Sequence, residues 1–68
     1  MRLKEIRKRL GITQVKMAMD LHLSQNSVSR YETGRHEPDL RTLVRIADYL
    51  NVSLDELVGR EFPPNANH

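Results

Sequence analysis

The 68-residue sequence contains no cysteine, which excludes both a disulfide framework and a thiolate metal site. No apolar run approaches the roughly 20 residues that a membrane-spanning helix requires. The basic start of the chain alternates Leu3 and Ile6 with charges, unlike a signal peptide. Aromatic residues make up only 4% of the chain, and no segment alternates apolar and polar residues as a strand would. These absences favour a small all-α domain, which we expect in the cytoplasm.

The net charge is only +2, but it is unevenly distributed along the chain. Residues 1–41 hold nine Lys or Arg against five acidic residues, whereas residues 42–68 hold two against four. The first part of the chain is therefore suited to a polyanion such as nucleic acid, and the second part is not.

Capping residues predict where most of the helices begin. A hydroxyl or carboxylate side chain precedes four segments with helical apolar spacing, and three of these caps carry a hydrophobic staple around them. The predicted starts are Gln14, Gln25, Leu40 and Leu54. A further helix over residues 2–10 is predicted to end at Gly11, and Asn51, which tolerates the left-handed region, is predicted to end the helix that starts at Leu40.

The pattern therefore predicts five helices around one core in a domain of residues 1–60. The apolar residues at helical spacing are the core candidates: Leu3, Ile6, Leu10, Met17, Ala18, Leu21, Val28, Tyr31, Leu43, Ile46, Ala47, Leu50, Val52, Leu54 and Leu57. Leu40 is expected to join them at the start of its helix. Prolines and polar residues near the end of the chain predict a flexible tail over residues 61–68.

The segment from Thr13 to Gly34 is predicted to be a helix-turn-helix motif. The small side chain of Ala18 lets the two helices approach closely, and Val28 points the second helix toward the core. The second helix, residues 25–33, is polar on its other face. A helix that is docked on one side and polar on the other is typical of DNA recognition, and it would enter the major groove.

Several local motifs resemble the Xre family, the Cro and phage-repressor type of helix-turn-helix protein. They are RLGITQ, SQNSVSRYETG, the P-D-L helix start and NVSLDEL, and the likeness covers about residues 3–59. The resemblance implies a compact five-helix domain with the lambda-repressor-like fold. It also implies a transcriptional regulator, specifically a repressor that binds a palindromic operator in double-stranded DNA as a homodimer.

Polar side chains of the second helix are the candidates for base recognition. Amides can pair with adenine, and a guanidinium with guanine, in the major groove. We predict this role for Gln25, Asn26, Ser29 and Arg30.

A second set of polar groups is predicted to contact the DNA backbone: Thr13, Gln14, Ser24, Ser27, Arg35 and Arg41. The free N–H groups around Gln14 favour phosphate, and its amide is also expected to brace Gln25. The loop after the recognition helix lies along DNA in the family, which implicates Arg35 and Arg41. The alternative for these two arginines is an ordinary solvated surface.

The resemblance further implies that Arg7 pairs with Glu32 at the end of the recognition helix. Such a pair would tie two helices together and leave guanidinium donors for phosphate. The alternative is an exposed pair with little effect on stability. One departure from the family is His22, which stands where the turn usually has glycine and costs about 1 kcal/mol there.

Val15 and Met19 also depart from the family, since charged residues usually occupy these positions. They are either scattered surface residues or a contact for a protein partner. The second interpretation gives an alternative function, that of an antitoxin or adaptor on the same scaffold.

The family likeness places a dimer seam on the carboxy-terminal helices. The exposed apolar candidates for that seam are Val44, Tyr49, Val58 and Phe62. His22, His36 and His68 lack the spacing of metal ligands, so no metal and no other cofactor is expected. No catalytic constellation indicates an enzyme.

Overall fold

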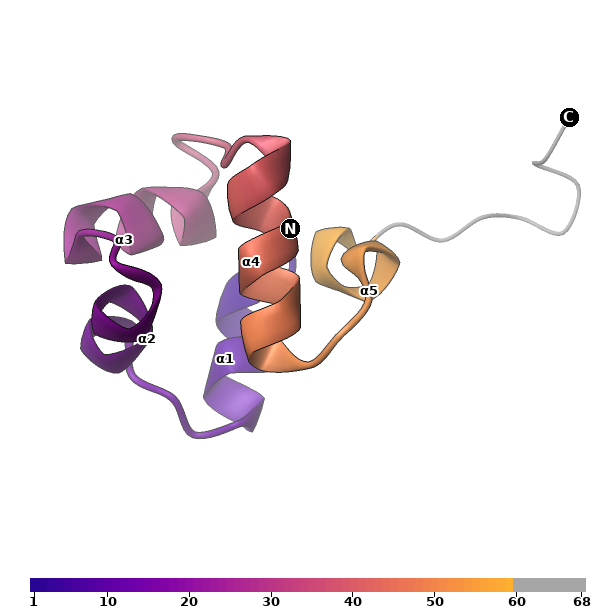
Figure 1. Ribbon diagram of the computed structural model, residues 1–68, viewed down its shortest axis with the longest axis horizontal. Coiled ribbons are helices and arrows are strands. Elements are labelled where there is room, and N and C mark those ends of the chain that lie inside the picture. The colour runs from indigo at the N-terminus through magenta and orange to yellow at the C-terminus, as the bar shows by residue number, and fades with distance from the viewer. Residues whose placement is uncertain (60–68) are drawn as a thin grey trace, which may run out of the picture.

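The computed structural model describes residues 1–59, which form five α-helices and, within that range, no strand. In chain order the helices are α1 (Leu3–Arg9), α2 (Gln14–Leu21), α3 (Gln25–Thr33), α4 (Leu40–Leu50) and α5 (Leu54–Val58) (Figure 1). The all-α prediction is confirmed. The predicted tail, residues 61–68, lies outside the described residues.

Four of the helices begin where a side-chain oxygen accepts the backbone N–H three residues later. Thr13 accepts from Lys16 at 3.0 Å, and the other three caps use the same geometry at 2.8 to 3.0 Å. These caps are Ser24, Asp39 and Ser53. Each cap satisfies one of the N–H groups that a helix start leaves without a partner, so the helix begins directly after it. The predicted starts of α2 to α5 are confirmed.

The predicted staples also have the expected burial. Met17, Val28 and Leu57 are fully buried four residues after their caps. The apolar residues before the same caps, Ile12, Leu23 and Val52, are half-buried against the core. Each staple therefore fixes the direction in which the chain enters a helix.

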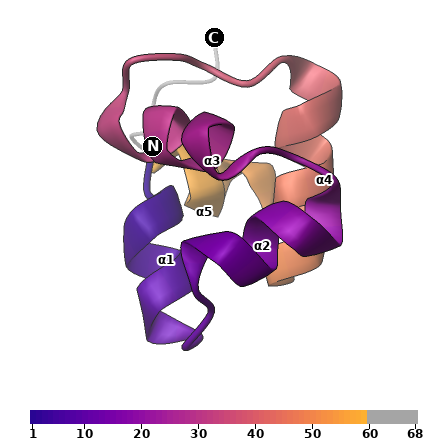
Figure 2. The same ribbon diagram turned by 90° about the vertical axis from the view of Figure 1, so that its left-hand side faces the viewer.

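The helices surround a single core to which all five contribute. Figure 2 shows α2 crossing between α1 and α4, with α3 above it. The buried apolar residues are Leu3, Ile6, Met17, Ala18, Leu21, Val28, Ile46, Ala47, Leu50 and Leu57. At the crossing of α2 and α3, Ala18 is 4% exposed and Val28 is fully buried, as the motif predicts. No helix within residues 1–59 is long and apolar enough to span a bilayer.

Three predicted core residues are instead exposed. Leu10 is 47% exposed, Leu40 is 70% exposed and Leu54 is 37% exposed. All three lie at helix ends: Leu10 follows the last residue of α1, and the other two begin α4 and α5. The prediction was wrong because helical spacing assigns a face only while the helix continues, and a helix end extends past the neighbours that cover its middle.

Candidate nucleic-acid interface

The helix α3 separates a buried side from a polar side. Val28 is fully buried, and Tyr31 is half-buried against the core. Gln25, Asn26 and Arg30 are exposed along the rest of the helix. The amide and guanidinium groups predicted to contact bases are therefore accessible to a ligand. Ser29, the fourth predicted residue, is only half-buried and lies at the margin of this surface.

The caps at the starts of α2 and α3 use the hydroxyl groups that were predicted to contact the DNA backbone. Ser24 Oγ accepts the Ser27 N–H at 3.0 Å and donates to Ser27 Oγ at 2.9 Å. Thr13 is exposed, and its hydroxyl oxygen accepts from Lys16 N. Because an accepting hydroxyl keeps its own proton, the Thr13 cap can still donate to a phosphate oxygen.

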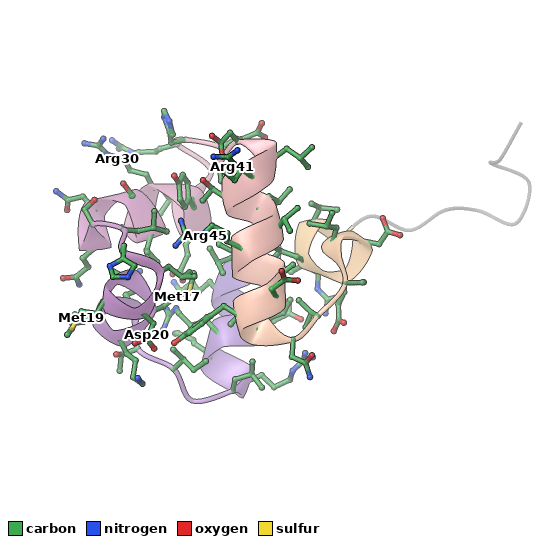
Figure 3. The ribbon with its side chains drawn as sticks, viewed as in Figure 1. Met17, Met19, Asp20, Arg30, Arg41 and Arg45 are labelled. Carbon is green, nitrogen blue, oxygen red and sulfur yellow. The ribbon has the colours of Figure 1, made fainter. Side chains whose placement is uncertain are left out.

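The loop after α3 folds back onto the end of the helix. The Arg30 carbonyl accepts the backbone N–H groups of Arg35 at 3.0 Å and His36 at 3.3 Å, around left-handed Gly34. Arg35 and Arg41 are both exposed. Figure 3 places the Arg30 and Arg41 side chains on the same side of the molecule, one on α3 and the other at the start of α4. Arg35 on the loop and Arg41 on α4 therefore place two guanidinium groups near the polar face of α3, with Glu37 and Asp39 between them in the sequence.

A largely buried group of polar side chains, here called the Glu32 cluster, joins α1, α2 and α3. It consists of Arg7, Gln14 and Glu32. Arg7 Nε donates to Glu32 Oε2 at 2.5 Å, Arg7 Nη2 donates to Oε1 at 3.2 Å, and Gln14 Nε2 donates to Oε1 at 2.9 Å. The Arg7 side chain is 9% exposed and that of Glu32 only 2%.

The environment of Glu32 keeps its carboxylate ionised. Burial, the largest single influence, raises the pKa of Glu32. Hydrogen bonds from Arg7 and Gln14, with the charges of Arg7 and Lys4, together outweigh burial and hold the pKa below its ordinary value. The Glu32 cluster is therefore a charged pair inside the fold, and the alternative of an exposed pair is excluded.

This cluster bears on the predicted roles of Arg7 and Gln14. Arg7 was expected to keep donors for phosphate; its third nitrogen, Nη1, donates to the Ile12 carbonyl at 2.8 Å, so three of its five N–H groups are used within the protein. These bonds hold Arg7 in the fold, where it is 7% exposed, and a phosphate contact through its remaining N–H groups stays a prediction. Gln14 was expected to brace Gln25, but its amide nitrogen donates to Glu32 instead. Gln14 is half-buried, so its carbonyl oxygen and second N–H can still face a ligand.

At its other end, α2 is held by a second group of side chains, here called the Asp20 cluster. It consists of Lys16, Asp20 and Tyr49. Asp20 Oδ2 accepts from Tyr49 Oη at 2.5 Å and from Lys16 Nζ at 3.0 Å. Both bonds hold the pKa of Asp20 below its ordinary value, and the bond to Asp20 raises the pKa of Tyr49 to about 12. Nearby, Arg45 Nη2 donates to the Leu21 carbonyl.

Only part of this second group of contacts has a signal in the sequence. The i,i+4 spacing of Lys16 and Asp20 is visible in the sequence. The bonds of Arg45 and Tyr49 join residues 24 and 29 positions apart in the sequence, respectively, so they leave no local sequence pattern. Tyr49 was predicted to be an exposed apolar residue of a dimer seam. Tyr49 is half-buried rather than exposed, because its ring packs against the core and its hydroxyl bonds to Asp20 on α2; its place in a dimer seam stays a prediction.

The other apolar candidates differ in their exposure. Val44 is 38% exposed, Val15 is 48% exposed and Met19 is 70% exposed, pointing away from the molecule in Figure 3. Val58 is half-buried, in contrast to the expectation that it is exposed. Phe62 lies outside the described residues. Within residues 1–59, no group of three or more His, Asp or Glu side chains could hold a metal ion.

A domain of five helices, four of them with side-chain caps, and a polar helix docked through one buried valine is typical of helix-turn-helix DNA-binding regulators. Residues 3–57 match the family model described as helix-turn-helix. On this match, the chain belongs to the Xre (Cro/C1-type) helix-turn-helix family, a non-enzymatic family of repressor-like transcriptional regulators.

Individual relatives support the same assignment. The chain is 44% identical over 59 residues to the transcriptional repressor RstR of the cryptic phage CTXphi in Vibrio cholerae. It is 40% identical over 60 residues to the transcriptional regulator ImmR of Bacillus subtilis, and 37% identical over 60 residues to the immunity repressor of Bacillus phage phi105. The matches cover 87%, 88% and 88% of this chain, in that order, and 53%, 47% and 42% of the relatives. The chain thus spans about half the length of these relatives.

Proposed function

We propose that the chain binds double-stranded DNA sequence-specifically, with α3 in the major groove, and represses transcription from a two-fold symmetric operator. The observation that carries the proposal is the division of α3, in which Val28 is buried while Gln25, Asn26 and Arg30 are exposed. A helix fixed on one side and polar on the other can present hydrogen-bonding groups to base edges without first rearranging.

Phosphate contacts would hold α3 in register on the duplex. We assign them to exposed Thr13, Ser24, Arg35 and Arg41, with half-buried Gln14 and Ser27 beside them. Two arginines on the loop side and two capped helix starts on the other side would flank the base contacts. Such contacts position the protein, while the exposed side chains of α3 discriminate between sequences.

Selection of bound sites from random duplex DNA tests the proposal. The expected result is a two-fold symmetric motif with half-sites one helical turn apart, about 34 Å. Two matched variants separate the roles of the residues. Gln25→Ala should relax the sequence preference at one base position. Arg35→Ala should instead weaken binding to all duplexes alike, and it should reduce the slope of log affinity against log salt concentration by about one. Equal affinity for every duplex would remove sequence recognition from the proposal.

The symmetric operator requires two copies of the chain, and we propose a homodimer formed through α4 and α5. The support is the exposed apolar surface of these helices, with Leu40 70% exposed, Val44 38% exposed and Leu54 37% exposed. Sedimentation at high micromolar concentration should give a dimer, and Val44→Glu should give a monomer. A monomeric wild-type chain both alone and on the selected DNA would contradict the dimer.

A cytoplasmic location stays a prediction.

One observation favours a second candidate function. Val15 and Met19 form an exposed apolar pair on α2 that the core does not use. In an antitoxin or adaptor this pair would contact a protein partner. The variant Val15→Glu/Met19→Glu distinguishes the two functions when tested against the product of a neighbouring reading frame. Loss of partner binding with DNA affinity unchanged supports the second function, and binding that survives the substitutions argues against it.

A further inference from the structure

Five residues within 1–59 have a left-handed backbone: Gly11, His22, Gly34, Asn51 and Gly59. Glycine adopts this region freely and asparagine tolerates it. His22 has φ 57° and ψ 39°, so its β-carbon lies close to the following carbonyl oxygen. The turn between α2 and α3 is therefore the left-handed turn with the bulkiest side chain among these five.

The same turn receives support from a distant helix. The Leu21 carbonyl, at the end of α2, accepts a hydrogen bond from Arg45 Nη2 on α4. Figure 3 shows the Arg45 side chain reaching from α4 toward α2 and α3. This carbonyl belongs to the peptide unit that joins Leu21 to His22. Because φ of His22 is the rotation of that residue against this peptide plane, a donor that fixes the plane also restricts φ.

The turn determines how α3 leaves α2. Leu23 N–H bonds back to the Ala18 carbonyl at 2.8 Å, and Ser24 caps α3 two residues after His22. Any change in φ of His22 would therefore rotate the first turn of α3, which carries Gln25 and Asn26. Hydrogen bonds to base edges require these groups to be placed within about 0.5 Å.

We propose that Arg45 is a positioning residue for the recognition helix: by holding the Leu21 carbonyl, it maintains left-handed His22 and the angle between α2 and α3. Arg45 thus compensates for the absence of glycine in this turn. The effect on DNA recognition rests on the proposed function, whereas the effect on the turn does not. The two parts can therefore fail separately.

A double-mutant cycle on stability tests the effect on the turn. Arg45→Met keeps the hydrocarbon stem and removes the donors, and His22→Gly removes the need for support. Arg45→Met should lower the ratio of folded to unfolded chain about tenfold, which is the scale of one hydrogen bond. In the His22→Gly background the same substitution should lower this ratio clearly less. Equal losses in both backgrounds, measured by urea unfolding, would overturn the proposal. If Arg45→Met does not fold in the wild-type background, its folding in the His22→Gly background supports the proposal, and failure to fold in both backgrounds overturns it.

Operator preference tests the effect on recognition. With a selected operator and a scrambled duplex of the same length, Arg45→Met should reduce the ratio of the two affinities about tenfold, and His22→Gly should restore much of it. Arg41→Met is the matched control, because it removes a charge beside the same surface and should weaken both duplexes alike. If Arg45→Met also weakens both alike, Arg45 acts only through its charge and the positioning role is wrong. If the wild-type chain prefers no duplex, the proposed function fails while the stability cycle still decides the role of Arg45.

Discussion

The two polar groups that hold α2 use similar chemistry in different surroundings. The Glu32 cluster joins the start of α2 to α1 and α3, with side chains that are 9% and 2% exposed at the ion pair. The Asp20 cluster joins the end of α2 to α4, and its Lys16–Asp20 pair has side chains 66% and 36% exposed. Water competes for the second group and screens its charges, whereas little water reaches the first.

This difference indicates what each group contributes. A buried ion pair gains little over well-packed apolar side chains, but removing one partner leaves a charge without solvent. The Glu32 cluster should therefore behave as a unit that tolerates no partial loss. In the Asp20 cluster, each lost bond can be replaced by a bond to water, so removing one of its members should lower the stability only slightly.

Breaking the Glu32 cluster on one side should give the largest effect. Arg7→Met leaves the Glu32 carboxylate buried without its cation, so the free energy of unfolding should fall by about 3–5 kcal/mol. Urea unfolding followed by circular dichroism measures this loss. The double variant Arg7→Met/Glu32→Met should recover much of it, since the remaining charge is gone. A single variant as stable as the wild type would show that the cluster behaves like a surface pair.

Acid should expose the same difference through pH. The pKa of Glu32 is lower in the folded chain than in the unfolded chain, so its stabilising effect is complete above the unfolded pKa and is lost as pH falls through the folded pKa. Stability should therefore decrease on acidification below about pH 4, near the unfolded pKa of a glutamate. In Glu32→Gln, which cannot titrate, this part of the pH dependence should be absent. An identical slope in both chains would assign the acid sensitivity to other carboxylates.

The sequence predicts the parts of this molecule that depend on neighbours along the chain. The caps of α2 to α5 and left-handed Asn51 follow from chemistry that acts over three or four residues. The Arg7–Glu32 contact spans 25 residues and came only from the family likeness. The bonds of Arg45 and Tyr49 to α2 had no counterpart in any local pattern. For the interface, the sequence identified exposed Gln25, Asn26 and Arg30 but not the engagement of Gln14 by Glu32.

The smallest expected effect concerns the phenol of Tyr49. Its pKa is raised to about 12 because its hydroxyl donates to the Asp20 carboxylate, and ionisation would place two negative charges side by side. The bond therefore contributes fully below the unfolded pKa of about 10 and is lost as pH rises toward the folded value. Absorbance titration of the phenolate should show Tyr49 ionising at lower pH in Asp20→Asn than in the wild type, while stability at neutral pH changes far less than in Arg7→Met. A Tyr49 titration unchanged by Asp20→Asn would mean that the hydroxyl bonds to water in solution, and Tyr49 would then not help to hold the end of α2.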